Sequence, residues 1–129
     1  MQRATRSGKL VFANGWPFIT NQGELVVGER VRFWYYNRGY ENHRVADGKL
    51  LIGDDCYING SIIRAHKEVC IGNGVFLAPG SILSDTTDWW SDQPATAAIT
   101  VGDHAWLATR CTIMPRCTLA NQPWLALVL

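Results

Sequence analysis

A six-residue spacing of large aliphatic side chains constrains the fold of this chain more than any other feature. An α-helix needs apolar residues every three to four positions, and a long flat strand needs strict alternation. A period of six satisfies neither, so it predicts a short strand, a turn and another short strand, three times in each coil. The two clearest series are Ile71, Leu77 and Leu83, followed by Val101, Leu107, Ile113 and Leu119.

Four longer segments repeat one pattern around a glycine. Each has an aliphatic residue, the glycine, two mostly polar residues, a small residue, a free position and a large apolar residue. One large and one smaller side chain would fill each side of a narrow interior, and Gly, Asp and Asn suit the tight corners between the strands. The glycines are Gly28, Gly53, Gly72 and Gly102.

The same register places three of the four cysteines on different interior walls, where they cannot readily form disulfides. The four cysteines include no CxxC pair, so we expect reduced, buried thiols and no metal site. With no secretory pattern in residues 1–9, the chain is expected to be cytoplasmic. The predicted stacks are Cys56 with Val75 and Ala105, Cys111 with Ile62 and Ser81, and Cys117 with Val69.

Length and composition describe one domain, residues 1–129, with 47% hydrophobic residues. The 12 basic and 11 acidic residues give a net charge of +1. This balance argues against a nucleic-acid-binding protein or one that binds an anionic membrane, because both use a basic excess. No apolar run approaches the roughly 20 residues of a membrane span.

From Lys9 to about Leu119 the pattern resembles the hexapeptide-repeat acyltransferases. The resemblance implies an all-β fold, a left-handed parallel β-helix of about five coils. It also implies a homotrimer in which acetyl-CoA lies between neighbouring subunits and donates an acetyl group to a hydroxyl or amine. A sugar is one candidate for this small-molecule acceptor.

The family uses about eighteen residues per coil, so longer glycine spacings predict loops. The spacings here are 25, 19 and 30 residues. They predict extruded loops at about 34–47 and 84–96, and one surplus residue near Ile63–Arg64. A C-terminal tail, 121–129, follows the repeat.

The family's loop motif supplies two carboxylates and a histidine that acts as the general base. Asp85 and Asp88 match the carboxylates, although both also suit a loop turn. Trp89 or Trp90 stands in the histidine position, and an indole cannot accept a proton. The base would then be another histidine beside a corner, with His66 and His104 as the main candidates. His43, in the first predicted loop, is a third.

The best-matching segment, residues 99–120, borders the donor cleft in the family, and within it Trp106, Ala108 and Arg110 are the candidate acetyl-CoA contacts. Trp106 could equally cover the outer wall. Aromatic side chains in the two predicted loops either shape the acceptor pocket or pack between subunits. These side chains include Tyr35, Tyr36, Trp89 and Trp90.

Two other functions compete with acetyl transfer. One is a non-catalytic trimeric binding or assembly module, favoured by the missing loop histidine and the short C-terminus. That end is either a cap over the last coil or the remainder of a longer repeat. The other is a gamma-class carbonic anhydrase, whose zinc needs three histidines. The spacings of 23 and 38 residues between His43, His66 and His104 do not match that family's pattern.

Overall fold

The computed structural model describes residues 5–14, 18–21, 23–34, 42–45, 48–86, 95–115 and 118–119. In these residues all regular secondary structure is β, in short strands of two to four residues. The strands form three sheets, and neighbouring strands in each sheet run parallel. None of the described residues form a helix long and apolar enough to cross a membrane.

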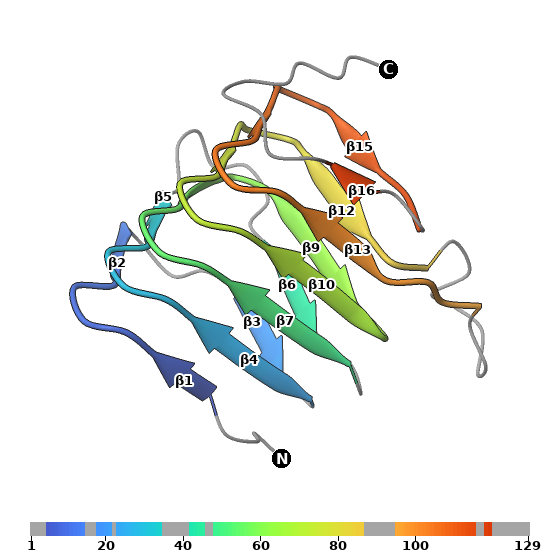
Figure 1. Cartoon of the computed structure of the whole chain (residues 1–129), viewed down its shortest axis with the longest axis horizontal. Helices are drawn as coiled ribbons and strands as arrows, with labels where there is room; N and C mark the ends of the chain where they lie inside the picture. Colours follow the sequence, from blue (N-terminus) through green and yellow to red (C-terminus); the bar gives the residue numbers. More distant parts are fainter. Residues whose placement is uncertain are drawn as a thin grey trace.

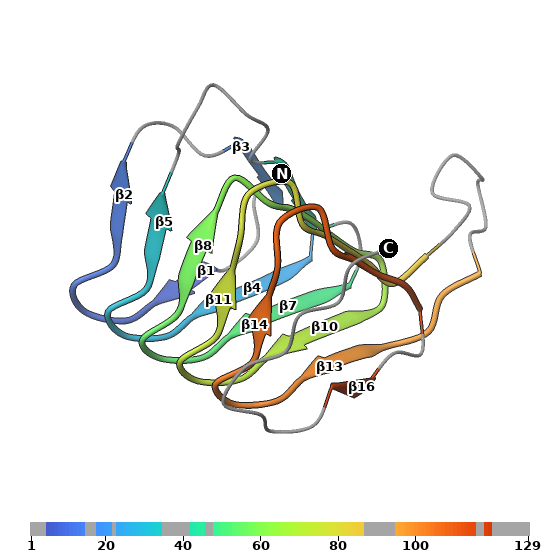
Figure 2. The same cartoon turned by 90° about the horizontal axis from the view of Figure 1, so that it is seen from above.

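Sheet A contains six strands, and sheets B and C contain five each (Figures 1 and 2). In spatial order, sheet A is β1 (Thr5–Ser7), β4 (Glu24–Val27), β7 (Lys49–Ile52), β10 (Glu68–Ile71), β13 (Ile99–Val101) and β16 (Thr118–Leu119). Sheet B is β2 (Phe12–Asn14), β5 (Arg32–Trp34), β8 (Tyr57–Asn59), β11 (Phe76–Leu77) and β14 (Trp106–Leu107). Sheet C is β3 (Phe18–Asn21), β6 (Asn42–Val45), β9 (Ile62–Ala65), β12 (Ile82–Ser84) and β15 (Thr112–Ile113).

Consecutive strands always belong to different sheets, so each circuit of the chain adds one strand to every sheet. This topology confirms the prediction of three short strands per coil, and it is compatible with a β-helix. The first circuit begins at Thr5, upstream of the expected start at Lys9.

The interior is a set of columns in which equivalent residues of successive coils lie above one another. Cys56, Val75 and Ala105 are all buried, and the strands that follow them are in register. This confirms the predicted Cys56 column, which Val31 extends by one coil. Burial of these apolar columns, at about 25 cal/mol per Å², provides the main driving force for folding.

The predicted Cys111 column is wrong at one of its members: Ser61, and not Ile62, occupies the inward position. Ile62 points outward and is only partly buried, while Ser61 is fully buried and lies in register with Ser81. Ser61 follows Ile58 by three positions, whereas Ser81 follows Leu77 by four. The shorter corner shifts the inward position back by one.

The two predicted loops differ in how well their bounds agree with the structure. The segment 34–47 includes strand β6, and Trp34 still belongs to β5, so every described residue of this segment is in a strand. Residues 35–41 and 46–47 lie outside the described part of the chain. The surplus residue expected near Ile63–Arg64 is not there, because both residues pair with β12. The extra length lies in the passage from β9 to β10. Ile71 follows Ile63 by eight positions, whereas their register equivalents Leu119 and Ile113 are six positions apart.

At the second predicted loop, Thr86 pairs antiparallel with Thr96, so the two ends of the loop meet at its base. Residues 87–94, the tail 121–129 and Cys117 lie outside the described residues.

One corner is held by a ladder of side-chain hydrogen bonds between coils. The backbone N–H of Glu29 donates to Asp54 Oδ1, that of Asp54 to Asn73 Oδ1, and that of Asn73 to Asp103 Oδ1, each at 2.8 Å. Each acceptor belongs to the next coil, so the short polar residues of the repeat bind adjacent coils together.

Candidate functional site

Two of the predicted site residues, His66 and Asp85, meet at the corner between sheets C and A. His66 follows β9, and Asp85 follows β12 on the next coil. Asp85 is fully buried. Its carboxylate accepts hydrogen bonds from the backbone N–H groups of His66 (2.8 Å to Oδ1, 3.0 Å to Oδ2), Lys67 (2.6 Å) and Glu68 (2.9 Å). The extra residues of this corner therefore wrap around a buried carboxylate.

The imidazole of His66 lies against the same carboxylate. Its Nδ1 is 3.7 Å from Asp85 Oδ1, and the side chain is 10% exposed. Among the described residues, Nδ1 has no hydrogen-bond partner. The pair thus has the components of a general base and the group that orients it.

His104, the other main candidate for the base, lies at a different corner, between β13 and β14. It is exposed, and its backbone has a φ of 61°. In the described part of the chain, no salt bridge joins His104 to a carboxylate. His43 lies in β6 rather than in a loop, paired with Ile19 and Ile63.

The three predicted acetyl-CoA contacts lie on one coil. Trp106 is on the outer face of β14 and is 43% exposed. Ala108 and Arg110 are in the corner that follows, where the carbonyl of Ala108 accepts a hydrogen bond from Cys111 at 3.1 Å. Arg110 has a φ of 61° and lies over Gly80 of the preceding coil. The remaining predicted residues, Asp88, Trp89, Trp90, Tyr35 and Tyr36, lie outside the described residues.

A ladder of aromatic rings, not predicted from the sequence, runs along the outer face of sheet B. Centroids are 6.1 Å apart for Phe12 and Trp34, 6.4 Å for Trp34 and Tyr57, 5.0 Å for Tyr57 and Phe76, and 6.4 Å for Phe76 and Trp106. The first three pairs are stacked, and the last meets edge to face. A signal was available, since Tyr57, Phe76 and Trp106 each come directly before a buried aliphatic residue of the repeat.

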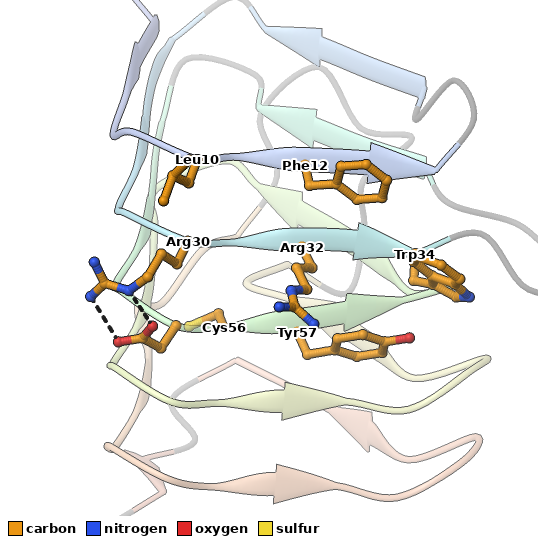
Figure 3. Close-up of a pocket in the computed structure, with 8 residues that line it drawn as sticks. Leu10, Phe12, Arg30, Arg32, Trp34, Cys56 and Tyr57 are labelled. Atoms are coloured by element: carbon orange, nitrogen blue, oxygen red, sulfur yellow. Dashed lines mark hydrogen bonds and ion pairs between the residues drawn. The ribbon is translucent and has the colours of Figure 1, made fainter.

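A groove of about 740 Å³ opens on this face over β2, β5 and β8 (Figure 3). Its aromatic side is formed by Phe12, Trp34 and Tyr57, and Arg32 lies on the floor between them. The rest of its lining is Leu10, Arg30, Asp55 and Cys56.

Arg30 at the edge of the groove is neutralised by acidic neighbours. Its Nε and one terminal nitrogen donate to the Asp55 carboxylate at 2.6 and 3.0 Å, and the other terminal nitrogen donates to Glu29 at 3.1 Å. The hydrogen bond from Arg30 lowers the pKa of Asp55. One arginine and two carboxylates meet at this corner, so it adds no positive charge to the groove.

The described cysteines are all free thiols. Burial raises the pKa of Cys56 to about 11, which keeps it protonated and unreactive at neutral pH. Among the described residues no group of three or more His, Cys, Asp or Glu side chains is arranged to hold a metal ion.

No protein-family model, curated protein or solved structure matches this chain. Functional assignment therefore depends on the geometry of its own residues, and in particular on the His66–Asp85 pair and the aromatic groove.

Proposed function

We propose that this protein is an acyltransferase that moves an acetyl group from acetyl-CoA to a hydroxyl or amine of a small molecule, with a sugar as one candidate acceptor. The proposal includes a left-handed winding of the three sheets and a trimer of chains with the donor between subunits. It draws on the repeat's resemblance to the hexapeptide-repeat acyltransferases. The observation that carries it is the contact between the His66 imidazole and the buried Asp85 carboxylate.

In this mechanism His66 is the general base. It takes the proton from the acceptor hydroxyl or amine as that group attacks the thioester carbonyl, so a C–O or C–N bond forms and the C–S bond breaks. The protonated imidazole then returns a proton to the departing thiolate. Asp85 acts as a positioning residue, because its carboxylate lies beside the imidazole and does not contact the substrate.

Trp106, Ala108 and Arg110 are the candidates for holding acetyl-CoA, because they share one coil and its following corner. Asp88, Trp89, Trp90, Tyr35 and Tyr36 stay the candidates for the acceptor side, as the sequence predicts.

The test combines calorimetric titration with acetyl-CoA and turnover assays over a panel of sugars and amines. We expect His66→Gln to lower kcat by about 10²–10⁴-fold while leaving acetyl-CoA binding nearly unchanged. His104→Gln is the matched control and should retain wild-type turnover. If His66→Gln turns over as fast as the wild type, or if His104→Gln alone abolishes activity, His66 is not the base.

A second candidate function is a non-catalytic trimeric binding or assembly module. It is favoured by the hydrogen bonds of Asp85, since both carboxylate oxygens are occupied by corner amides and the residue has a structural role without any reaction. This candidate predicts that acetyl-CoA does not bind at millimolar concentration and that no acceptor is acetylated.

A further inference from the structure

The aromatic ladder on sheet B is interrupted by one cation. Register places Phe12, Arg32, Tyr57, Phe76 and Trp106 at equivalent outward positions of successive strands. Four of these positions hold rings, and only the second holds a charged residue. The chain of ring contacts passes around it through Trp34, two residues further along β5.

Arg32 differs from its neighbour Arg30 in having no acidic partner among the residues that the structure describes. Arg30 is bound by Asp55 and Glu29. Within the described residues, Arg32 makes no hydrogen bond or ion pair to any acidic side chain, and it is exposed to the groove. Figure 3 shows its side chain extending from β5 toward the side of Tyr57. The described lining of the groove therefore combines an aromatic wall with one guanidinium, that of Arg32, which is not paired with a described acidic side chain.

These features indicate which chemical groups a ligand of this groove would carry. A guanidinium binds a carboxylate, sulfonate or phosphate through paired N–H donors. The rings of Phe12, Trp34 and Tyr57 offer packing area for a flat apolar group. The volume of about 740 Å³ suits a small molecule. Leu10, 78% exposed with a φ of 59°, adds an apolar edge opposite the rings.

We propose that this groove binds a small planar aromatic anion, with its ring against Phe12, Trp34 and Tyr57 and its anionic group on the Arg32 guanidinium. The site is independent of the proposed acetyl transfer, because none of its residues belong to the His66–Asp85 corner. A second copy of this chain is a less suitable occupant, since symmetric contact of the two faces would bring two Arg32 charges together.

The test uses 2-naphthoate and the uncharged 2-naphthamide, which share one ring system and differ in the anionic group. Binding is followed by ligand-detected NMR and by calorimetry. We expect saturable 2-naphthoate binding with one site per chain. Arg32→Gln should weaken it by about tenfold or more and leave 2-naphthamide binding within about twofold, whereas Trp34→Ala should weaken both.

Arg6→Gln is the matched control, because Arg6 is an exposed arginine of β1 that lies outside the groove lining. It should bind 2-naphthoate like the wild type. The proposal is overturned if 2-naphthoate does not bind saturably, or if Arg32→Gln binds it as tightly as the wild type. It is equally overturned if sedimentation shows that copies of the chain cover this face and exclude the probe. None of these readouts uses acetyl-CoA, so failure here is separable from failure of the acyltransferase proposal.

Discussion

Asp85 and His66 are 19 residues apart in the sequence, yet the Asp85 carboxylate accepts two hydrogen bonds from the His66 backbone N–H and lies 3.7 Å from its imidazole. One carboxylate thus holds a corner of the preceding coil and lies beside the side chain at that corner. Stability and the proposed chemistry therefore depend on the same group, and substitutions of Asp85 must be analysed for both.

Replacing Asp85 should be among the most destabilising single polar changes in this protein. Asp85→Ala leaves three backbone N–H groups of the corner without their acceptor, so we expect the free energy of unfolding to fall by about 3 kcal/mol. Asp85→Asn keeps one acceptor oxygen, so its free energy of unfolding should fall by less than that of Asp85→Ala. Urea denaturation measures both. Asp54→Ala removes one exposed corner hydrogen bond and should cost about 1 kcal/mol or less; an equal loss in both alanine variants would contradict the prediction.

The stability of the fold should decline at alkaline pH through Cys56. Burial raises its pKa from 9.0 to about 11 in the folded protein. The unfolded thiol therefore ionises first, so the stabilisation is fully present below pH 9 and is lost as the pH rises from 9 toward 11. Cys56→Ala should flatten this decline in urea denaturation across that range.

The control for this pH dependence is Val75→Ala, which thins the same interior column without removing an ionisable group. It should lower stability at every pH and keep the alkaline slope of the wild type. If Cys56→Ala retains that slope as well, the thiol is not its source.

Two glycine-to-alanine substitutions should distinguish two causes of lost stability: a steric clash between coils and an unfavourable backbone conformation. A Cβ on Gly53 would lie 2.6 Å from the carbonyl oxygen of Gly72 in the next coil. Gly53→Ala should therefore push two coils apart and lower the unfolding free energy by about 3 kcal/mol. At Gly60 the nearest atoms would be 3.7 and 3.8 Å away, on Pro79, but φ is 52°.

Gly60→Ala should thus cost only about 1 kcal/mol, the penalty of an alanine in the left-handed region. Thermal denaturation of the two variants compares them directly. A larger loss at Gly60 than at Gly53 would show that corner conformation, not the spacing between coils, limits stability.

Removing a buried hydroxyl from the Cys111 column should not destabilise the protein. Ser81 is fully buried, and its Oγ has no hydrogen-bond partner among the described residues. Ser81→Ala should raise the free energy of unfolding by about 0.5–1 kcal/mol, since it relieves the burial of an unpaired polar group. Chemical denaturation measures the change. A loss of more than 1 kcal/mol would mean that the hydroxyl has a partner in solution.

Particular residues show how far the repeat could predict the fold. The Cys56 column follows from it directly, because a narrow interior admits only small side chains at that wall. Ser61 could not be placed in the same way, because the corner at Gly60 is one residue shorter than its counterpart at Gly80. Predicting a column from the six-residue period assumes that all corners have the same number of residues. Only the folded backbone shows which corners are shorter or longer.

The sequence by itself determined that this chain forms three short strands per coil with polar corners, because every coil must fill the same narrow interior with the same few side-chain sizes. Tertiary structure decided which residues of different coils meet. His66 reaches Asp85 through a lengthened corner and a full circuit of the chain. Arg32 lies among the aromatic rings because parallel pairing sets strands 20 and 25 residues apart side by side. Such contacts depend on register between coils, and loops of unequal length change that register without leaving a local pattern in the sequence.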